Sequence, residues 1–276
     1  LVPRDQIMNA VALNSLQMTS SMIIWPSVAG FMIQFIGMGP TLYANAVCLV
    51  IGIWGVLMMG QVRDDELDQS PPRVHRMLIE GLRYTKNTPV IFGVMTLGLA
   101  IAILGMPYLS LAPGFGREVF GMGASHAGLL MMIGGVGSII GTVVLASRPI
   151  QNQNRLFVAL GFLLSFSLIA FAANPWYYAA YAIMLVVGLA GSTIAVVGNS
   201  IMINVVPSKM LGRVGSVWSF YGGFIFMAGL PIGLIGEIYS LRWALGGAAA
   251  ILLIFLIWLG LLWAPLRKPF AEVTNQ

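Results

Sequence analysis

Charged side chains are scarce in this sequence, and their scarcity excludes most kinds of soluble protein. Asp, Glu, Lys and Arg make up 8% of the 276 residues, whereas hydrophobic residues make up 58%. A soluble globular domain usually carries about 25% charged residues on its surface. The composition therefore predicts an all-α fold, a polytopic bundle of transmembrane helices.

Cysteine and histidine are equally rare, which limits the chemistry that the chain can perform. The single Cys48 excludes an intramolecular disulfide. His75 and His126 have no cysteine or carboxylate at metal-ligand spacing, and no G-x-S-x-G nucleophile motif is present. We therefore expect no enzyme activity, no metal and no cofactor. The basic residues are scattered rather than clustered, so nucleic acid is not an expected partner despite the net charge of +5.

Eight stretches reach the roughly 20 apolar residues that a membrane-spanning helix needs. They cover residues 10–36, 41–59, 90–111, 124–146, 156–173, 176–205, 214–235 and 243–263. None has an Asp, Glu, Lys or Arg in its middle, so this part of the chain offers no intramembrane protonation site of its own. The one long polar segment ends in a basic amphipathic pattern, which predicts a helix lying on the cytoplasmic surface.

The distribution of basic residues predicts which loops are cytoplasmic. If the chain crosses the membrane at each expected span, twelve of its fourteen Lys and Arg fall on one side. Only Arg117 and Arg242 fall on the other. Since cytoplasmic loops carry the excess of basic residues, both ends of this chain and its long loop are expected to be cytoplasmic.

Two segments of the chain match each other at an offset of about 204 residues. The alignment pairs Pro3 with Pro207, Ser15 with Ser219 and, within one residue, Pro26 with Pro231. Because the two helices have the same direction six spans apart, they predict a duplicated six-helix unit in parallel orientation.

The repeat predicts how the chain is divided. Residues 1–60 would be the last two helices of an N-terminal six-helix half, and 61–89 the loop between the halves. Residues 90–264 would be the C-terminal half, and 265–276 a cytoplasmic tail. Four further helices are then expected upstream of Leu1, as partners that complete the first half.

On these features the sequence resembles the major facilitator superfamily, and most closely its enterobactin-exporter-like efflux branch. The resemblance covers the whole chain as helices 5 to 12 of such a transporter. Its motifs are LVPRDQ…NA at 1–10, Pro26 with Gly30, EGLRY at 80–84 and VPSKMLGRVGS at 206–216. Trp25 stands where these exporters often have glycine, and the loop 147–155 lacks the acidic residue of the superfamily's gating loop.

The resemblance implies secondary active efflux of small amphipathic molecules of the drug or siderophore type, by alternating access in a bacterial inner membrane. It also implies proton antiport. The alternative function is a non-transporting membrane bundle that acts as an assembly or sensory partner, which a mature protein of only eight helices would favour. The expected partners are a small-molecule substrate and the lipid bilayer.

Polar and aromatic residues within the expected spans are candidates for lining a substrate cavity. They are Asn14, Gln17, Ser21, Met106, Tyr108, Ser192, Asn199, Trp218 and Tyr221. Their alternative role is structural, because hydroxyl and amide side chains also bond neighbouring membrane helices at about 0.6 kcal/mol each. Aromatic and methionine side chains would suit a bulky, partly apolar ligand.

Other residues are candidates for bending helices and gating the cavity. Pro26, Pro107 and Pro231 each remove a helical hydrogen bond and should kink their spans, Pro26 together with Gly30. Lys209 and Arg213 lie at helix ends near the cytoplasm, where they could form a gate or simply anchor the topology. The glycines of 134–141 and 188–191 predict close helix packing or sliding.

Overall fold

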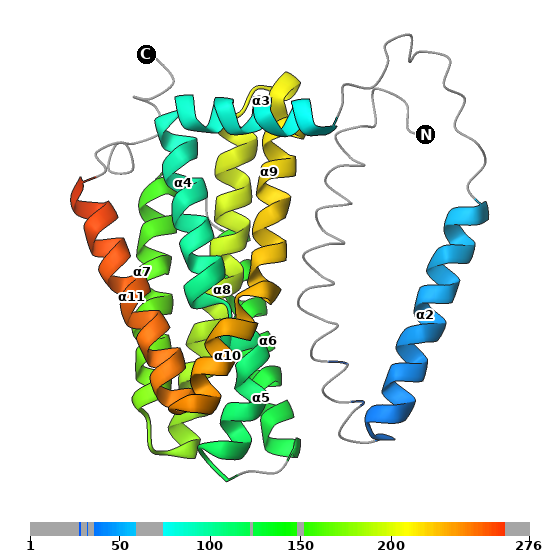
Figure 1. Cartoon of the computed structure of the whole chain (residues 1–276). Coiled ribbons are helices and arrows are strands. Elements are labelled where there is room, and N and C mark those ends of the chain that lie inside the picture. The colour runs from blue at the N-terminus through cyan, green and yellow to red at the C-terminus, as the bar shows by residue number, and fades with distance from the viewer. Residues whose placement is uncertain are drawn as a thin grey trace. The chain divides into compact units, whose positions relative to one another are not determined.

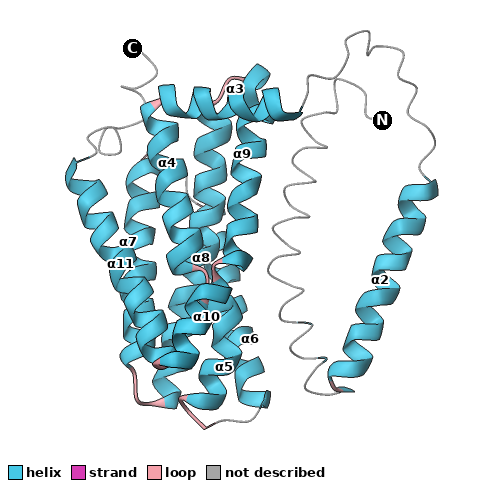
Figure 2. Ribbon diagram, in the orientation of Figure 1, coloured by secondary structure: helices cyan, strands magenta, loops and turns pink. Residues whose placement is uncertain are grey.

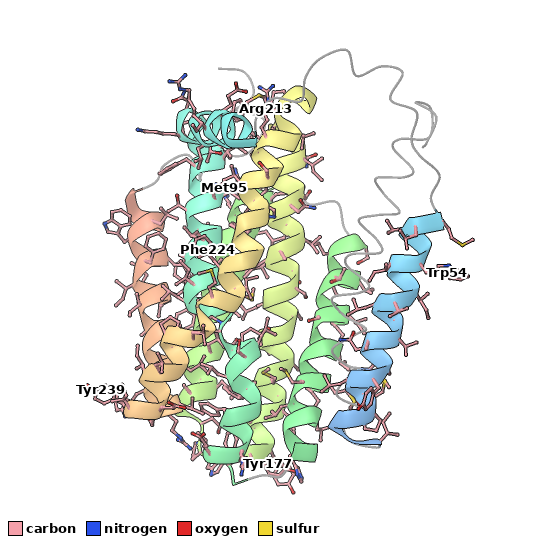
Figure 3. All side chains as sticks on the ribbon, turned by 45° about the vertical axis from the view of Figure 1, so that its right-hand side comes forward. Trp54, Met95, Tyr177, Arg213, Phe224 and Tyr239 are labelled. Atoms are coloured by element: carbon pink, nitrogen blue, oxygen red, sulfur yellow. The ribbon has the colours of Figure 1, made fainter. Side chains whose placement is uncertain are left out.

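The computed structural model describes residues 28, 32, 36–58, 74–121, 124–147 and 152–262. They form helices and no strands (Figure 2). The chain divides into two compact units, Leu1–Pro72 and Arg73–Gln276. The described part of the first unit is mainly helix α2, Met38–Met58. Most of its described side chains are exposed, Trp54 among them (Figure 3). Such a surface suits lipid or further helices.

The second unit is a helix bundle (Figure 1). Its helices are α3 (Val74–Asn87), α4 (Pro89–Ala100), the π-helix η2 (Ile101–Gly105), α5 (Tyr108–Glu118), α6 (Ala124–Ala146), α7 (Gln153–Ala173), α8 (Tyr177–Val205), α9 (Ser208–Met227), α10 (Gly229–Ile238) and α11 (Leu241–Leu262). Helix α3 lies across the bundle near one end, roughly perpendicular to the long helices. We call this end of the bundle the α3 end.

Seven helical segments of the described residues are long and apolar enough to cross a membrane. They correspond to the second through eighth spans expected from the sequence, and the fold is the predicted all-α polytopic bundle. The first expected span, 10–36, lies almost entirely outside the described residues. Two of the spans are not single continuous helices. One consists of α4, η2 and the start of α5, and the other consists of α9 and α10.

Large apolar side chains on α4, α5, α7, α8 and α11 form most of the core of the second unit. Phe157, Leu164 and Leu168 of α7 are fully buried, as are Leu252 and Leu256 of α11. These positions recur every three to four residues, so each helix turns a single stripe inward. The opposite faces keep exposed apolar side chains, as expected of helices that contact lipid.

Glycines bring α6 and α8 into backbone contact along a seam. A Cβ atom added to Gly188 would stand only 2.6 Å from the carbonyl carbon of Gly134. A Cβ on Gly137 would collide with the carbonyl oxygen of Leu185. The Ser138 hydroxyl crosses the seam and donates to the Gly188 carbonyl at 3.1 Å. Small residues therefore allow the close approach that holds membrane helices together.

Candidate functional site

The third span is interrupted where the sequence places Pro107. Proline has no N–H to donate, and its ring crowds the preceding turn. The chain responds with a π-turn, in which the Met106 N–H donates to the Ile101 carbonyl five residues back at 2.9 Å. Helix α5 restarts at Tyr108. π-Bulges occur frequently at functional sites, which makes this interruption a candidate.

The seventh expected span is also interrupted. Helix α9 ends at Met227 and α10 begins at Gly229, leaving Ala228 in a turn. The cause lies in Pro231, which cannot donate to the carbonyl of Met227 four residues earlier. The span is therefore two shorter helices that can tilt separately.

The two interruptions meet at the same depth in the bundle. Helices α4 and α9 both begin at the α3 end, at Pro89 and Ser208. Pro107 lies 18 residues after the first of these starts and Ala228 lies 20 residues after the second. A Cβ on Gly229 would lie 2.8 Å from Ser110 Oγ and 3.3 Å from Ser110 Cβ. We call this contact between α5 and α10 the break junction. It is the feature that most distinguishes the bundle from a set of straight rods.

Met106 and Tyr108 flank the first interruption but do not line an open space. Their side chains are 5% and 6% exposed, and both belong to the main hydrophobic core. A Cβ on Gly191 of α8 would lie 3.3 Å from the Tyr108 hydroxyl and 3.6 Å from Met106 Cε. In this structure they fill the space above Gly191, which fixes the interrupted span against α8.

Ser192 is bonded within the α6–α8 seam. Its hydroxyl lies 3.0 Å from the Gly188 carbonyl in its own helix and 3.3 Å from the Ser138 carbonyl across the seam. Asn199, two turns further along the same face of α8, is exposed. Of these two candidates from α8, Asn199 is the more exposed, whereas Ser192 is half-buried and bonded within the seam.

Trp218 of α9 is half-buried against α8. A Cβ on Gly198 would lie 2.9 Å from the tip of its indole ring and 3.0 Å from the Phe157 ring. The position of the ring therefore depends on the absence of a side chain at Gly198.

Figure 3 labels Met95 on α4 and Phe224 on α9, and Phe224 is 38% exposed. These two interrupted spans carry apolar and sulfur-containing side chains on their accessible surfaces.

A separate contact joins α3 to α9 at the α3 end. Glu80 and Arg213 form an ion pair at 2.5 Å, with each side chain about one-third exposed. Gly81 lies so close to α9 that a Cβ there would collide with the Arg213 carbonyl oxygen. The Ser216 hydroxyl donates to the same carbonyl at 2.7 Å. Arg213 thus binds a carboxylate, and we call this contact the α3–α9 clasp.

Several predicted site residues fall outside what the structure describes. Asn14, Gln17, Ser21, Pro26 and Gly30 all lie outside the described residues. For Lys209 and Tyr221 the helix is described but the side chain is not. Their proposed roles remain predictions.

The structure adds residues that sequence reasoning missed, namely Ser110, Gly229, Glu80 and Gly81. Each of these residues lies beside a feature of the sequence that could have identified it. Ser110 and Gly229 are small residues within three positions of the prolines that interrupt their spans. Gly81 interrupts an amphipathic helix next to its single acid, which is a position where another backbone can approach. What the sequence did not reveal is the pairing across more than one hundred residues.

The chain as a whole matches one known family. Residues 1–271 match the family described as transmembrane secretion effector. No curated protein matches the chain.

Proposed function

Because the chain belongs to the transmembrane secretion effector family, membrane transporters of the major facilitator type, we propose that it exports small amphipathic molecules by alternating access. The resemblance to the enterobactin-exporter-like branch suggests substrates of the drug or siderophore type. The structural observation that supports this proposal is the break junction. Discontinuous helices are the elements from which transporters build sites near the middle of the membrane.

The interruptions give the junction a way to move. A continuous helix transmits a tilt along its whole length, whereas α5 and α10 can each change angle at Pro107 and Ala228 without moving α4 or α9. Their contact at Ser110 and Gly229 has only a small side chain on one side and none on the other. Small contacts of this kind let helices slide with little steric cost, and we propose that α5 and α10 shift there during the transport cycle.

The exposed side chains of the described spans suit a substrate with an apolar surface. Phe224 and Met227 are exposed at 38% and 66%, and Asn199 adds an amide. Methionine adapts its shape and aromatic rings supply area, so both tolerate ligands of different outline. The interiors of the described spans carry no Asp, Glu, Lys or Arg, so a ligand there would be held by apolar and amide contacts rather than by a counter-charge.

Proton antiport forms part of the proposal through the family resemblance. The carboxylate that binds the proton would then lie outside the described spans, since their acids Glu118 and Glu237 stand near helix ends. We place the protein in a bacterial inner membrane with the α3 end in the cytoplasm, because most of the basic residues in the described helices lie towards that end.

Transport of a fluorescent amphipathic cation tests the proposal directly. The protein, expressed from its complete reading frame, is reconstituted into vesicles that contain ethidium, and an inward proton gradient is imposed so that proton entry can drive ethidium exit. We expect ethidium to leave the vesicle lumen faster than from protein-free vesicles, and an ionophore that collapses the gradient to abolish the difference. Equal rates with and without protein, for ethidium and for a catecholate siderophore, would contradict the proposed function.

A further inference from the structure

Helix α3 presents a face that the bundle does not use. Gly81 and Thr85 are buried against the bundle, whereas Ile79 and Leu82 are 48% and 55% exposed. Arg83 and Lys86 are exposed as well. The spacing of these four residues places them on one side of the helix. We call this set, Ile79, Leu82, Arg83 and Lys86, the α3 stripe.

The α3 stripe lies beside the bundle, at the level where a span meets its headgroups. Gly81 contacts α9 at Arg213 and Val217, which follow the start of α9 by five and nine residues. At 1.5 Å per residue these contacts lie about 8 and 14 Å from that end. Helix α3 therefore crosses the flank of α9 rather than covering its tip. Thr88 alone separates α3 from Pro89, where the next span begins.

The chemistry of the α3 stripe favours a negatively charged, partly apolar partner. It contains two cations and two apolar side chains, and the single acid of α3, Glu80, is paired with Arg213. Lys and Arg side chains reach from an interfacial helix to phosphate groups while neighbouring Leu and Ile sit at the acyl boundary. We propose that the α3 stripe is a docking surface for the headgroups of anionic phospholipids, a role independent of the transport function.

Lipid fits this surface better than a soluble protein does. A cytoplasmic partner would have to approach at membrane level, where headgroups already occupy the space. An anionic leaflet supplies both the phosphate charge and the apolar boundary at that level, so it complements all four residues at once. Each basic residue near such a leaflet contributes about 1 kcal/mol, which is roughly a fivefold preference over neutral lipid.

Quenching by spin-labelled lipids tests the proposal. The full-length protein, with Cys48→Ala and Asn87→Cys, carries a fluorophore at position 87, an exposed site at the end of α3. It is reconstituted into phosphatidylcholine vesicles containing a little nitroxide-labelled phosphatidylglycerol or, separately, nitroxide-labelled phosphatidylcholine. We expect stronger quenching by the anionic lipid, and a preference that weakens as ionic strength rises.

Two variants decide whether the α3 stripe causes the preference. Arg83→Gln and Lys86→Gln should each lower it by about fivefold, whereas the control Arg117→Gln, an exposed arginine on α5, should leave it unchanged. All three positions are exposed, so thermal unfolding should remain as in the parent. The proposal would be overturned if both lipids quenched equally, or if the preference survived the double substitution Arg83→Gln with Lys86→Gln. It would also be overturned if neither lipid quenched the fluorophore. The last result would indicate a protein partner on the α3 stripe instead.

Discussion

Replacing Gly188 by alanine should loosen the α6–α8 seam more than the size of a methyl group suggests. The new Cβ would stand 2.6 Å from the carbonyl carbon of Gly134 and 2.9 Å from its Cα. Ordinary contacts of this kind are about 3.5–4.0 Å, so the helices must separate by roughly 1 Å. Backbone atoms cannot rotate away as a flexible side chain would, and the strain is therefore spread along both helices.

The expected loss of stability follows from two contributions. Overpacking in a well-packed core costs about 1–3 kcal/mol. Separation also stretches the bonds that Ser138 and Ser192 make across the seam at 3.1 and 3.3 Å, at about 0.6 kcal/mol each. We therefore expect Gly188→Ala to lower the free energy of unfolding by about 2–4 kcal/mol, a large share of the 5–15 kcal/mol typical of folded proteins.

A matched glycine provides the control. Gly247 lies within α11, and a Cβ there would have no atom of a neighbouring helix within 4 Å. Because alanine favours a helix over glycine by about 1 kcal/mol, Gly247→Ala should be neutral or slightly stabilising. Unfolding is measured for both variants in the same detergent by denaturant titration. If Gly188→Ala unfolds at the same denaturant concentration as Gly247→Ala, the close approach of α6 and α8 is wrong.

Three further predictions concern the site. Asn199→Ala should slow ethidium efflux without changing thermal stability, whereas Ser192→Ala should cost about 0.6 kcal/mol and leave efflux intact; the reverse pattern would exchange their roles. Glu80→Gln and Arg213→Gln should show a coupling energy of about 0.5–1 kcal/mol in a double-mutant cycle of unfolding, and additivity would show that the clasp contributes nothing. Pro107→Ala should stabilise a continuous third span and lower the efflux rate, so an unchanged rate would argue against hinge motion there.

The spans could be predicted from the sequence because each is a long apolar run, and the interruptions because proline cannot complete a helical turn. Ends of helices were less predictable. The seventh expected span, 214–235, in fact starts at Ser208 and reaches Ile238 as two helices. Its first two turns carry Lys209 and Arg213, so they resemble a loop when only the length of the apolar run is counted.

The side chains that face a cavity could not be predicted in the same way. Apolar residues surround most of these helices, so periodicity does not tell the inward face from the lipid face. Tyr108 and Ser192 looked like cavity residues because they are polar or aromatic within apolar spans, yet the structure places both against neighbouring helices. The partners that decide this, Gly191 and Ser138, are 83 and 54 positions away from them.

A disulfide across the break junction tests whether α5 and α10 must move against each other during transport. Both cysteine pairs are made in a Cys48→Ala background. Ser110→Cys with Gly229→Cys places two Cβ atoms 3.3 Å apart at the break junction. The control pair, Ala172→Cys with Gly246→Cys, places two Cβ atoms 3.2 Å apart between α7 and α11. Both separations lie close to the roughly 3.5–4.5 Å of a disulfide, so both pairs should crosslink on oxidation. We predict that oxidation stops ethidium efflux only in the first pair and that reduction restores it. Full efflux by protein whose break junction is fully crosslinked would contradict the account.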